Sequence, residues 1–180
     1  MKKDFFLSIG RLTKQKNHKT LIKAFNEFSK HNDNYELIIL GTGELEGDLK
    51  KLVKKLNLYE KIHFMGQVDN VFKYIKKSKA VISTSLWEEC SYVLIEAAYL
   101  NLIIHSDCKS GPEEFIEENK CGYLFNKNSY SHLANTMQKF LNDSKDEVYN
   151  KKLKAKIKTK EYTCYAHYKK FSKVLMKHNF

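Results

Sequence analysis

Several features that mark other classes of protein are missing from this 180-residue sequence. No apolar run reaches the roughly 18 to 20 residues that cross a bilayer, and the first residues form no signal-peptide pattern. The four cysteines include no Cys-x-x-Cys pair and the histidines do not cluster, so neither a disulfide framework nor a metal site is expected. We therefore expect a cytoplasmic protein that holds no metal.

Arginine is nearly absent as well. Of the 32 basic residues, only Arg11 is an arginine, and the others are lysines. A planar guanidinium forms bidentate hydrogen bonds with a phosphate that an ammonium cannot reproduce. Arg11 is therefore a candidate ligand-contacting residue, with a chance departure from the lysine bias as the alternative.

The formal net charge of +11 raises the question of an anionic partner. Lysines occur on the polar sides of most expected helices, and only residues 151–160 are dense enough to form a basic patch. A solvated helix face is the first interpretation of this patch, and weak attraction to an anionic membrane surface is the second. In the second case the protein is peripheral at the inner face of the membrane. We do not expect a nucleic-acid partner.

Apolar periodicity divides the chain into short buried strands that alternate with amphipathic helices up to about residue 125. From about Tyr130 the pattern is purely helical, and a terminal helix is expected to carry Tyr165, Tyr168, Phe171 and Leu175. The expected strands are Phe5–Ile9, Tyr35–Leu40, Lys61–Met65, Ala80–Thr84, Leu102–Ser106 and Gly122–Phe125.

This alternation requires crossover connections, because each helix must carry the chain back before the next strand begins. We therefore expect a single α/β domain with a doubly wound, parallel, six-stranded, Rossmann-like sheet. Helices should cover both faces, and residues 130–180 should form a helical C-terminal part of the same domain. An apolar fraction of 42% and an aromatic fraction of 13% support a globular chain of this kind.

In such a sheet, ligands bind in the crevice beyond the carboxyl ends of the strands. Small and charged residues follow the expected strand ends at Gly10-Arg11, Gly41-Thr42-Gly43, Gly66, Ser85 to Glu89 and Ser106 to Pro112. Loops are rich in small polar residues in any case. An arginine, a lysine and two glutamates directed at one crevice nevertheless favour a binding site.

Glu96 interrupts an otherwise apolar helical run over residues 92–100. A carboxylate in such surroundings costs several kcal/mol unless it is paired, hydrogen-bonded or directed outward. Ser91 is expected to cap this helix, which leaves the amides of Val93 and Leu94 free to bind an anion. Glu96 then lies one turn inside, where it can accept hydrogen bonds from two ribose hydroxyls. A salt bridge to a nearby lysine and an exposed surface glutamate are the alternatives.

Two other patterns are weaker. Gly41, Gly43 and Gly47 have the spacing GxGxxxG after the second strand, whereas the dinucleotide fingerprint is GxGxxG after the first. Glu88 and Glu96 also match the paired carboxylates of glycoside hydrolases, but a spacing across a loop does not fix the distance between two side chains. Neither pattern assigns a function by itself.

Five stretches occur in a fixed order. They are Ser8-Ile9-Gly10-Arg11-Leu12 with Lys14-Gln15-Lys16-Asn17, Leu40-Gly41-Thr42-Gly43-Glu44, Glu88-Glu89-Cys90-Ser91-Tyr92-Val93-Leu94-Ile95-Glu96, residues 106–114, and Gly122-Tyr123-Leu124-Phe125. The third resembles the EX7E motif of retaining glycosyltransferases of the GT-B fold, in particular family four. The others are similar to that family's GRL opening and basic loop, GxG turn, later loop and last strand. The resemblance covers about residues 4–176.

The resemblance implies a role for each matching residue. As catalytic groups, Arg11 and Lys16 would neutralise the diphosphate of a nucleotide-sugar donor, and Glu88 would face the transferred sugar and stabilise an oxocarbenium-like state. Glu96 would hold the ribose. The other donor-binding residues that the resemblance implies are Gly10, Gly41, Gly43, Ser91, Tyr92, Val93, Leu94, Gly111 and Pro112.

The resemblance also implies a missing partner. A GT-B enzyme has two such domains with the active site between them, and residues 1–180 match the C-terminal, donor-binding one. An N-terminal acceptor-binding domain would complete the site, so the isolated domain should be inactive or weakly active. The expected function is transfer of a hexosyl group from a UDP- or GDP-sugar to a glycan or lipid-linked acceptor in polysaccharide biosynthesis, without cofactor or metal.

Two readings from other classes stay open beside this one. The first is a non-catalytic nucleotide-sugar-binding module that docks on a separate acceptor domain, and the second is a GT-B-like nucleotide-sugar epimerase. The stretch Glu89-Cys90-Ser91 also stands where the family often has Gly-Phe-Gly, which leaves the identity of the donor sugar open.

Overall fold

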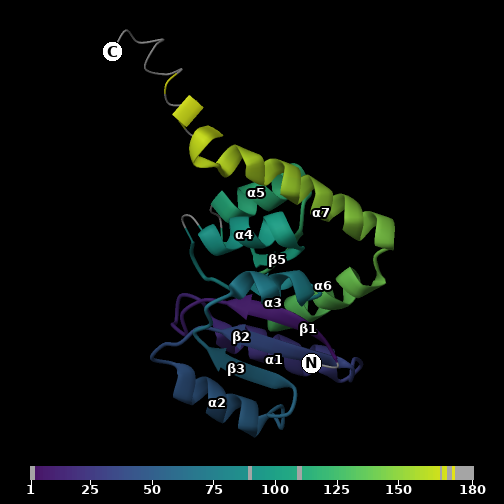
Figure 1. Cartoon of the computed structure of the whole chain (residues 1–180). Helices are drawn as coiled ribbons and strands as arrows, with labels where there is room; N and C mark the ends of the chain where they lie inside the picture. Colours follow the sequence, from purple (N-terminus) through teal and green to yellow (C-terminus); the bar gives the residue numbers. More distant parts are fainter. Residues whose placement is uncertain (1–2, 89–90, 109–110, 167, 170–171, 173–180) are drawn as a thin grey trace.

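A parallel sheet runs through the chain in the computed structural model, which describes residues 3–88, 91–108, 111–166, 168–169 and 172. Within these residues the strands are β1 (Asp4–Ile9), β2 (Tyr35–Leu40), β3 (Ile62–Gly66), β4 (Val81–Ser83), β5 (Ile103–Ser106) and β6 (Tyr123–Phe125). Their order is β3-β2-β1-β4-β5-β6, and all neighbours are parallel (Figure 1). The chain therefore winds outward from β1 to β3, returns to β4 and winds the other way.

Helices cover both faces of this sheet. They are α1 (His18–Ser29), α2 (Glu46–Lys55), α3 (Val71–Lys77), α4 (Tyr92–Leu100), α5 (Gly111–Asn119), α6 (Tyr130–Asn142), α7 (Lys145–Thr159) and the 3-10 turn η1 (Lys160–Tyr162). One apolar core joins α1, α2 and α6 to the sheet, and a second core joins α3, α4, α5 and α7 to its opposite face. The three layers follow from strands that are apolar on both sides.

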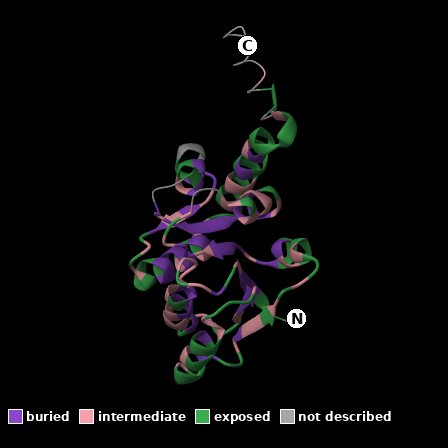
Figure 2. Cartoon of the chain, turned by 90° about the vertical axis from the view of Figure 1, so that its left-hand side faces the viewer, coloured by how far each residue is buried: buried purple, intermediate pink, exposed green. Residues whose placement is uncertain are grey.

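The alternation of side chains along β1 shows how one strand serves both cores. Phe6 packs on the α1 side, where its ring meets that of Phe28 edge to face with centroids 5.3 Å apart. Its neighbours Phe5 and Leu7 belong to the other core, because successive side chains of a strand point to opposite faces. Figure 2 shows the buried residues concentrated along the strands and on the helix sides that cover them.

A buried asparagine fixes the positions of α3 and α4. The Asn101 side chain, just after α4, donates from Nδ2 to the carbonyl oxygens of Ile75 and Ser78, each 2.7 Å away. Its Oδ1 accepts a hydrogen bond from the Leu102 amide at 2.8 Å. These bonds satisfy backbone groups at the ends of both helices, which would otherwise be buried without partners. The orientation of α4, which carries Glu96, is therefore set by tertiary contacts as well as by its own sequence.

The fold class predicted from the sequence is confirmed, with small shifts at the ends of elements. The third strand extends to Gly66, and the fourth is the short segment Val81–Ser83. Helices α6 and α7 confirm the helical pattern after Tyr130, whereas Phe171 and Leu175 of the expected terminal helix lie outside the described residues. Within the described ranges, no helix has both the length and the apolar character needed to cross a membrane.

Candidate functional site

The strand order fixes the edge of the sheet at which a ligand site is expected. Strands β1 and β4 are neighbours, and the chain continues from them in opposite directions across the sheet. At such a topological switch point the loops that leave the two strands diverge, and ligands bind between them. The loop after β1 contains Arg11 and Lys16, and the loop after β4 contains Glu88. The fold thus brings the predicted catalytic residues to the same edge.

Two glycines hold the Arg11 loop against the turn after β2. Gly41 has φ +127°, and a Cβ atom there would lie 2.1 Å from the Gly10 carbonyl oxygen. A Cβ atom at Gly43 would lie 2.6 Å from the Leu12 carbonyl oxygen. No side chain fits in these contacts, so glycine is required for the close approach. The geometry gives both glycines a positioning role in placing Arg11.

Hydrogen bonds between main chain and side chains join the loops after β1 and β4. The hydroxyl of Thr84 donates to the carbonyl oxygen of Lys16 at 2.8 Å. The amide of Leu86 donates to the carbonyl oxygen of Gln15 at 2.8 Å, and the side-chain amide of Gln15 donates to the carbonyl oxygen of Trp87 at 3.0 Å. Because these bonds cross between two loops, the two loops form one connected unit.

A salt bridge also joins these two loops. The ammonium of Lys16 lies 2.6 Å from Oε2 of Glu88, and the two side chains are 20% and 10% exposed. Arg11, from the same loop as Lys16, is exposed, and its guanidinium has no hydrogen-bond or ion-pair partner among the described residues. The Lys16 ammonium and the Glu88 carboxylate therefore meet, and the loop after β1 supplies a second cation that the described part of the protein does not engage.

Two buried histidines near this pair were not predicted from the sequence. Burial and the nearby Lys16 charge lower the pKa of His18, at the start of α1, to about 4. Burial also lowers the pKa of His105, against the opposing effects of the Ser106 carbonyl and the Glu88 carboxylate. Both imidazoles are consequently neutral at pH 7. The signal for His105 is a polar pair, His105-Ser106, at the end of an otherwise apolar strand.

The first turn of α4 confirms the expected cap and corrects one expectation. Ser91 is the N-cap, and its hydroxyl accepts a hydrogen bond from the Leu94 amide. The same amide also lies 3.0 Å from the Ser91 carbonyl oxygen. The expectation that this amide is free for an anion is therefore wrong, because the cap itself occupies it. Tyr92 is exposed and Val93 half-buried, while Glu89 and Cys90 of the motif lie outside the described residues.

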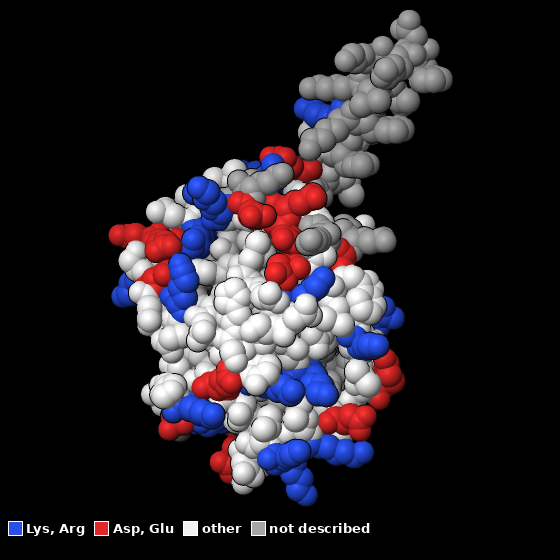
Figure 3. Space-filling model, turned by 180° about the vertical axis from the view of Figure 1, so that it is seen from behind, with Lys and Arg blue, Asp and Glu red and all other residues white. Residues whose placement is uncertain are grey.

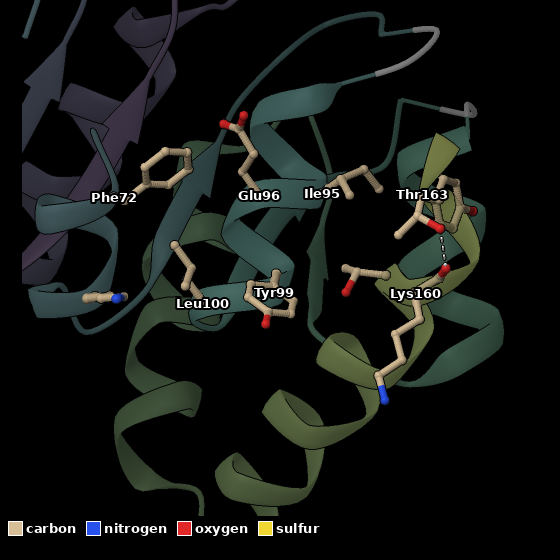
Figure 4. Close-up of a pocket in the computed structure, with 10 residues that line it drawn as sticks. Phe72, Ile95, Glu96, Tyr99, Leu100, Lys160 and Thr163 are labelled. Carbon is tan, nitrogen blue, oxygen red and sulfur yellow. Dashed lines mark hydrogen bonds between the residues drawn. The ribbon is translucent and has the colours of Figure 1, made fainter. Parts of the chain in front are cut away.

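Glu96 is half-buried on α4 and has no hydrogen-bond or ion-pair partner among the described residues. The alternative of a salt bridge to a nearby lysine is thus not found in that part of the chain. Glu96 borders a largely apolar hollow of about 520 Å³ between α3, α4 and the chain after α7, together with Phe72, Ile95, Tyr99, Leu100, Lys160 and Thr163 (Figure 4). Its carboxylate points away from Tyr99 and Lys160, at the opposite end of the residue group drawn.

The later loop contributes the start of α5. Gly111 and Pro112 are its first two residues, and a proline suits this position because its missing N–H would have no partner there. Lys109 and Ser110 lie outside the described residues. No group of three or more His, Cys, Asp or Glu side chains that could hold a metal ion occurs in the described part of the chain.

The surface charge is spread rather than gathered on the face opposite to that of Figure 1. Figure 3 shows the described lysines there interspersed with acidic and uncharged side chains. Several lysines are also neutralised locally, as in the pairs Lys50–Glu46 at 2.6 Å and Lys61–Asp33 at 2.6 Å. On this face the charge does not form the continuous basic surface that nucleic-acid binding requires.

Comparison with known proteins identifies the family of the chain. Residues 1–160 match the family described as "Glycosyl transferases group 1". The N-acetylgalactosamine-N,N'-diacetylbacillosaminyl-diphospho-undecaprenol 4-alpha-N-acetylgalactosaminyltransferase of Campylobacter jejuni is 34% identical over 160 residues, which cover 88% of this chain and 43% of that protein. The chain spans less than half the length of the curated relatives that it matches.

Solved structures share the fold. Anabaena Alr3699/HepE in complex with UDP superposes with a TM-score of 0.86 at 17% identity, over 98% of this chain and 49% of that one. The C-terminal domain of LpcC, a glycosyl transferase group 1 family protein from Francisella tularensis, superposes with a TM-score of 0.79 at 19% identity, over 91% and 89%. Because the family match extends over residues 1–160, this chain belongs to the glycosyltransferase group 1 family, of the GT-B type.

Proposed function

We propose that this chain is the donor-binding half of a retaining glycosyltransferase, which transfers a hexosyl group from a UDP- or GDP-sugar to a glycan or lipid-linked acceptor. The observation that carries the proposal is the Lys16–Glu88 pair, which joins the loops after β1 and β4 at the switch point with a separation of 2.6 Å. A sugar diphosphate needs cations for its phosphates and a carboxylate for its hydroxyls. This pair, together with Arg11 from the same loop as Lys16, supplies both.

In the proposed complex the two cations act on the leaving group. Arg11 and Lys16 bind the diphosphate and stabilise the negative charge that it gains as the bond to the sugar breaks. Each charge-assisted hydrogen bond of this kind contributes about 1.5–3 kcal/mol. Glu88 accepts hydrogen bonds from the sugar and stabilises the positive charge that develops on the ring. The cations serve in place of a metal ion, so the proposal requires none.

The remaining contacts come from α4 and α5. Glu96 has no partner in the described residues, which suits a carboxylate that accepts from two ribose hydroxyls. The first turn of α4, from Ser91 to Leu94, lies next to the phosphates in the proposal, and the positive end of the helix dipole favours them there. The engaged amide of Leu94 limits this contribution to the other groups of the turn. Gly111 and Pro112 border the donor sugar.

Relatives and neighbours support the class of donor and acceptor. The Campylobacter relative is named for transfer of N-acetylgalactosamine to a diphospho-undecaprenol-linked acceptor, and the Anabaena neighbour was solved with UDP. Since the chain spans less than half of such relatives, we propose that the acceptor site lies in a separate N-terminal domain. A non-catalytic nucleotide-sugar-binding subunit that docks on a separate acceptor domain is the second candidate.

Calorimetric titration of the chain with UDP and GDP, each with and without a chelator, tests the proposal. We expect binding at millimolar or lower nucleotide concentration that the chelator does not change. Arg11→Lys should weaken binding about tenfold, because an ammonium cannot form the bidentate contact. Lys55→Met, which removes an exposed lysine of α2, is the matched control and should bind normally. Absence of nucleotide binding at millimolar concentration in the unchanged chain rejects the proposal.

A second measurement separates the enzyme from the binding subunit. The acceptor domain of a relative is added in trans, and sugar transfer and release of free nucleotide are measured with Glu88→Gln as the comparison. Transfer that depends on Glu88 favours the enzyme. Nucleotide binding that persists without any transfer favours the binding subunit, and a changed donor sugar without transfer favours an epimerase.

A further inference from the structure

The outward face of α7 carries an exposed apolar stripe. Tyr149, Leu153 and Ile157 are spaced by four residues, so they lie on one side of the helix. They are 64%, 42% and 55% exposed. The opposite side of α7 holds the buried residues Ala155 and Thr159 and packs against α4 and α5. Because the helix is already anchored by that side, the apolar stripe does not serve the core of this chain.

Lysines flank this stripe on the same exposed surface. Lys156 and Lys160 each follow a stripe residue by three positions, and Lys145 precedes Tyr149 by four, so all three lie beside the stripe. Lys154 lies on its other side. Within the described residues, Lys145, Lys154 and Lys160 have no ion-pair partner, and the ammonium of Lys156 lies 5.2 Å from the centre of the Tyr99 ring.

Acidic residues do not balance this charge. The only acids of α7 are Asp146 and Glu147 in its first turn, and Glu147 is paired with Lys151 at 3.4 Å. From residue 148 to the end of the helix, every charged side chain is a lysine. A helix that only faced water would not expose three large apolar residues among these lysines. The combination suits a partner that is apolar and anionic at the same surface.

We propose that this α7 surface, formed by Tyr149, Leu153, Ile157 and the flanking lysines, docks on an anionic lipid bilayer. The apolar side chains enter the boundary between head groups and acyl chains, and the lysines remain at the level of the anionic head groups. The tyrosine suits this boundary because one end of its ring is polar. A nucleic acid would complement the lysines but would leave the apolar stripe without a partner.

The position of α7 supports this arrangement. In Figure 1 the helix lies along the end of the molecule opposite to α2. It contacts α4, and the start of α4 also borders the proposed donor crevice. Docking through Tyr149, Leu153 and Ile157 is separable from nucleotide binding, since none of these three residues lies in the loops after β1 and β4 or lines the hollow beside Glu96. The two proposals can therefore fail separately.

Vesicle sedimentation tests the α7 surface directly. The full 180-residue chain is mixed at low ionic strength with vesicles of phosphatidylcholine alone or of phosphatidylcholine with phosphatidylglycerol. We expect binding only to the anionic vesicles, with a loss as salt is raised. Lys145→Gln with Lys154→Gln should weaken it about fivefold per lysine. Leu153→Ser with Ile157→Ser should weaken it about tenfold, because the lysines alone cannot replace insertion.

The matched control removes two lysines from the other end of the molecule. Lys54→Gln with Lys55→Gln changes the net charge equally on α2 and should leave vesicle binding nearly unchanged. Calorimetry with UDP should be the same for all variants, and thermal unfolding should show that all are folded. The proposal is overturned if the chain does not bind anionic vesicles, or if the α2 control loses as much binding as the α7 variants. It is also overturned if light scattering shows that the chain self-associates through Leu153 and Ile157, so that Leu153→Ser with Ile157→Ser abolishes the association, while no vesicle binding is found.

Discussion

Removal of the Lys16 ammonium probes the contact on which the candidate site depends. In the substitution Lys16→Met the stem of the side chain is kept, and the group 2.6 Å from Glu88 is lost. The Glu88 side chain is only 10% exposed, so its carboxylate cannot recover full hydration. Glu88→Gln is less severe, because the flexible Lys16 side chain is 20% exposed and its ammonium can turn toward water.

The magnitude follows from the burial of the pair. A fully buried ion pair costs about 3–5 kcal/mol when one partner is removed, and an exposed pair about 0.2–1 kcal/mol. The Lys16–Glu88 pair lies between these limits. We expect Lys16→Met to lower the free energy of unfolding by about 2.5 kcal/mol and Glu88→Gln by about 1 kcal/mol, with a coupling energy of about 1.5–2 kcal/mol. The corresponding fall in melting temperature for Lys16→Met is about 5–10 °C.

Urea denaturation of the unchanged chain, both single variants and the double variant measures this coupling. The double variant should be clearly more stable than the sum of the single losses indicates, because it contains no unpaired charge. Effects that add to within about 0.3–0.5 kcal/mol would refute the reasoning, since independent sites behave in that way. The same four proteins titrated with UDP show whether the residues that stabilise the crevice also bind the nucleotide.

Three further predictions concern the surroundings of the site. Gly43→Ala should destabilise the chain by about 1–3 kcal/mol in urea denaturation, because its Cβ would lie 2.6 Å from the Leu12 carbonyl oxygen. The control Gly47→Ala, whose Cβ would meet nothing within 4 Å, should be neutral or stabilise α2 by up to about 1 kcal/mol. His18 of the unfolded chain binds a proton with a pKa near 6.5, whereas burial lowers the pKa of His18 in the folded chain to about 4. The free energy of unfolding should therefore fall by about 3 kcal/mol in all as the pH falls from 6.5 toward 4. His18→Gln should flatten this part of the profile of unfolding free energy against pH, and an unchanged slope would contradict the assignment. Asn101→Ala should lower the free energy of unfolding by about 2–4 kcal/mol in thermal or urea unfolding, because it removes the hydrogen bonds that join α3 and α4. A loss below about 1 kcal/mol would show that water replaces these hydrogen bonds.

Local patterns were sufficient for the elements of the fold. Continuous apolar runs such as residues 5–7 mark strands buried on both faces, and Ser91 marks the start of α4 through its capping chemistry. The same reasoning was wrong for the Leu94 amide, because it counted that group as free and overlooked that the cap would use it. The roles assigned to Arg11 and Glu96 stay predictions.

The order of the strands and the contacts across the crevice depend on tertiary structure. Lys16 and Glu88 are 72 residues apart, and they meet only because β1 and β4 are neighbours. Likewise, Gly41 can be recognised as a turn residue from the sequence, but the Gly10 carbonyl oxygen that excludes its side chain becomes visible only in the folded chain. Periodicity and capping act over a few residues, so the sequence specifies the class of fold and the residue types of the site. Which of those residues touch is decided by the packing of elements that lie far apart in the chain.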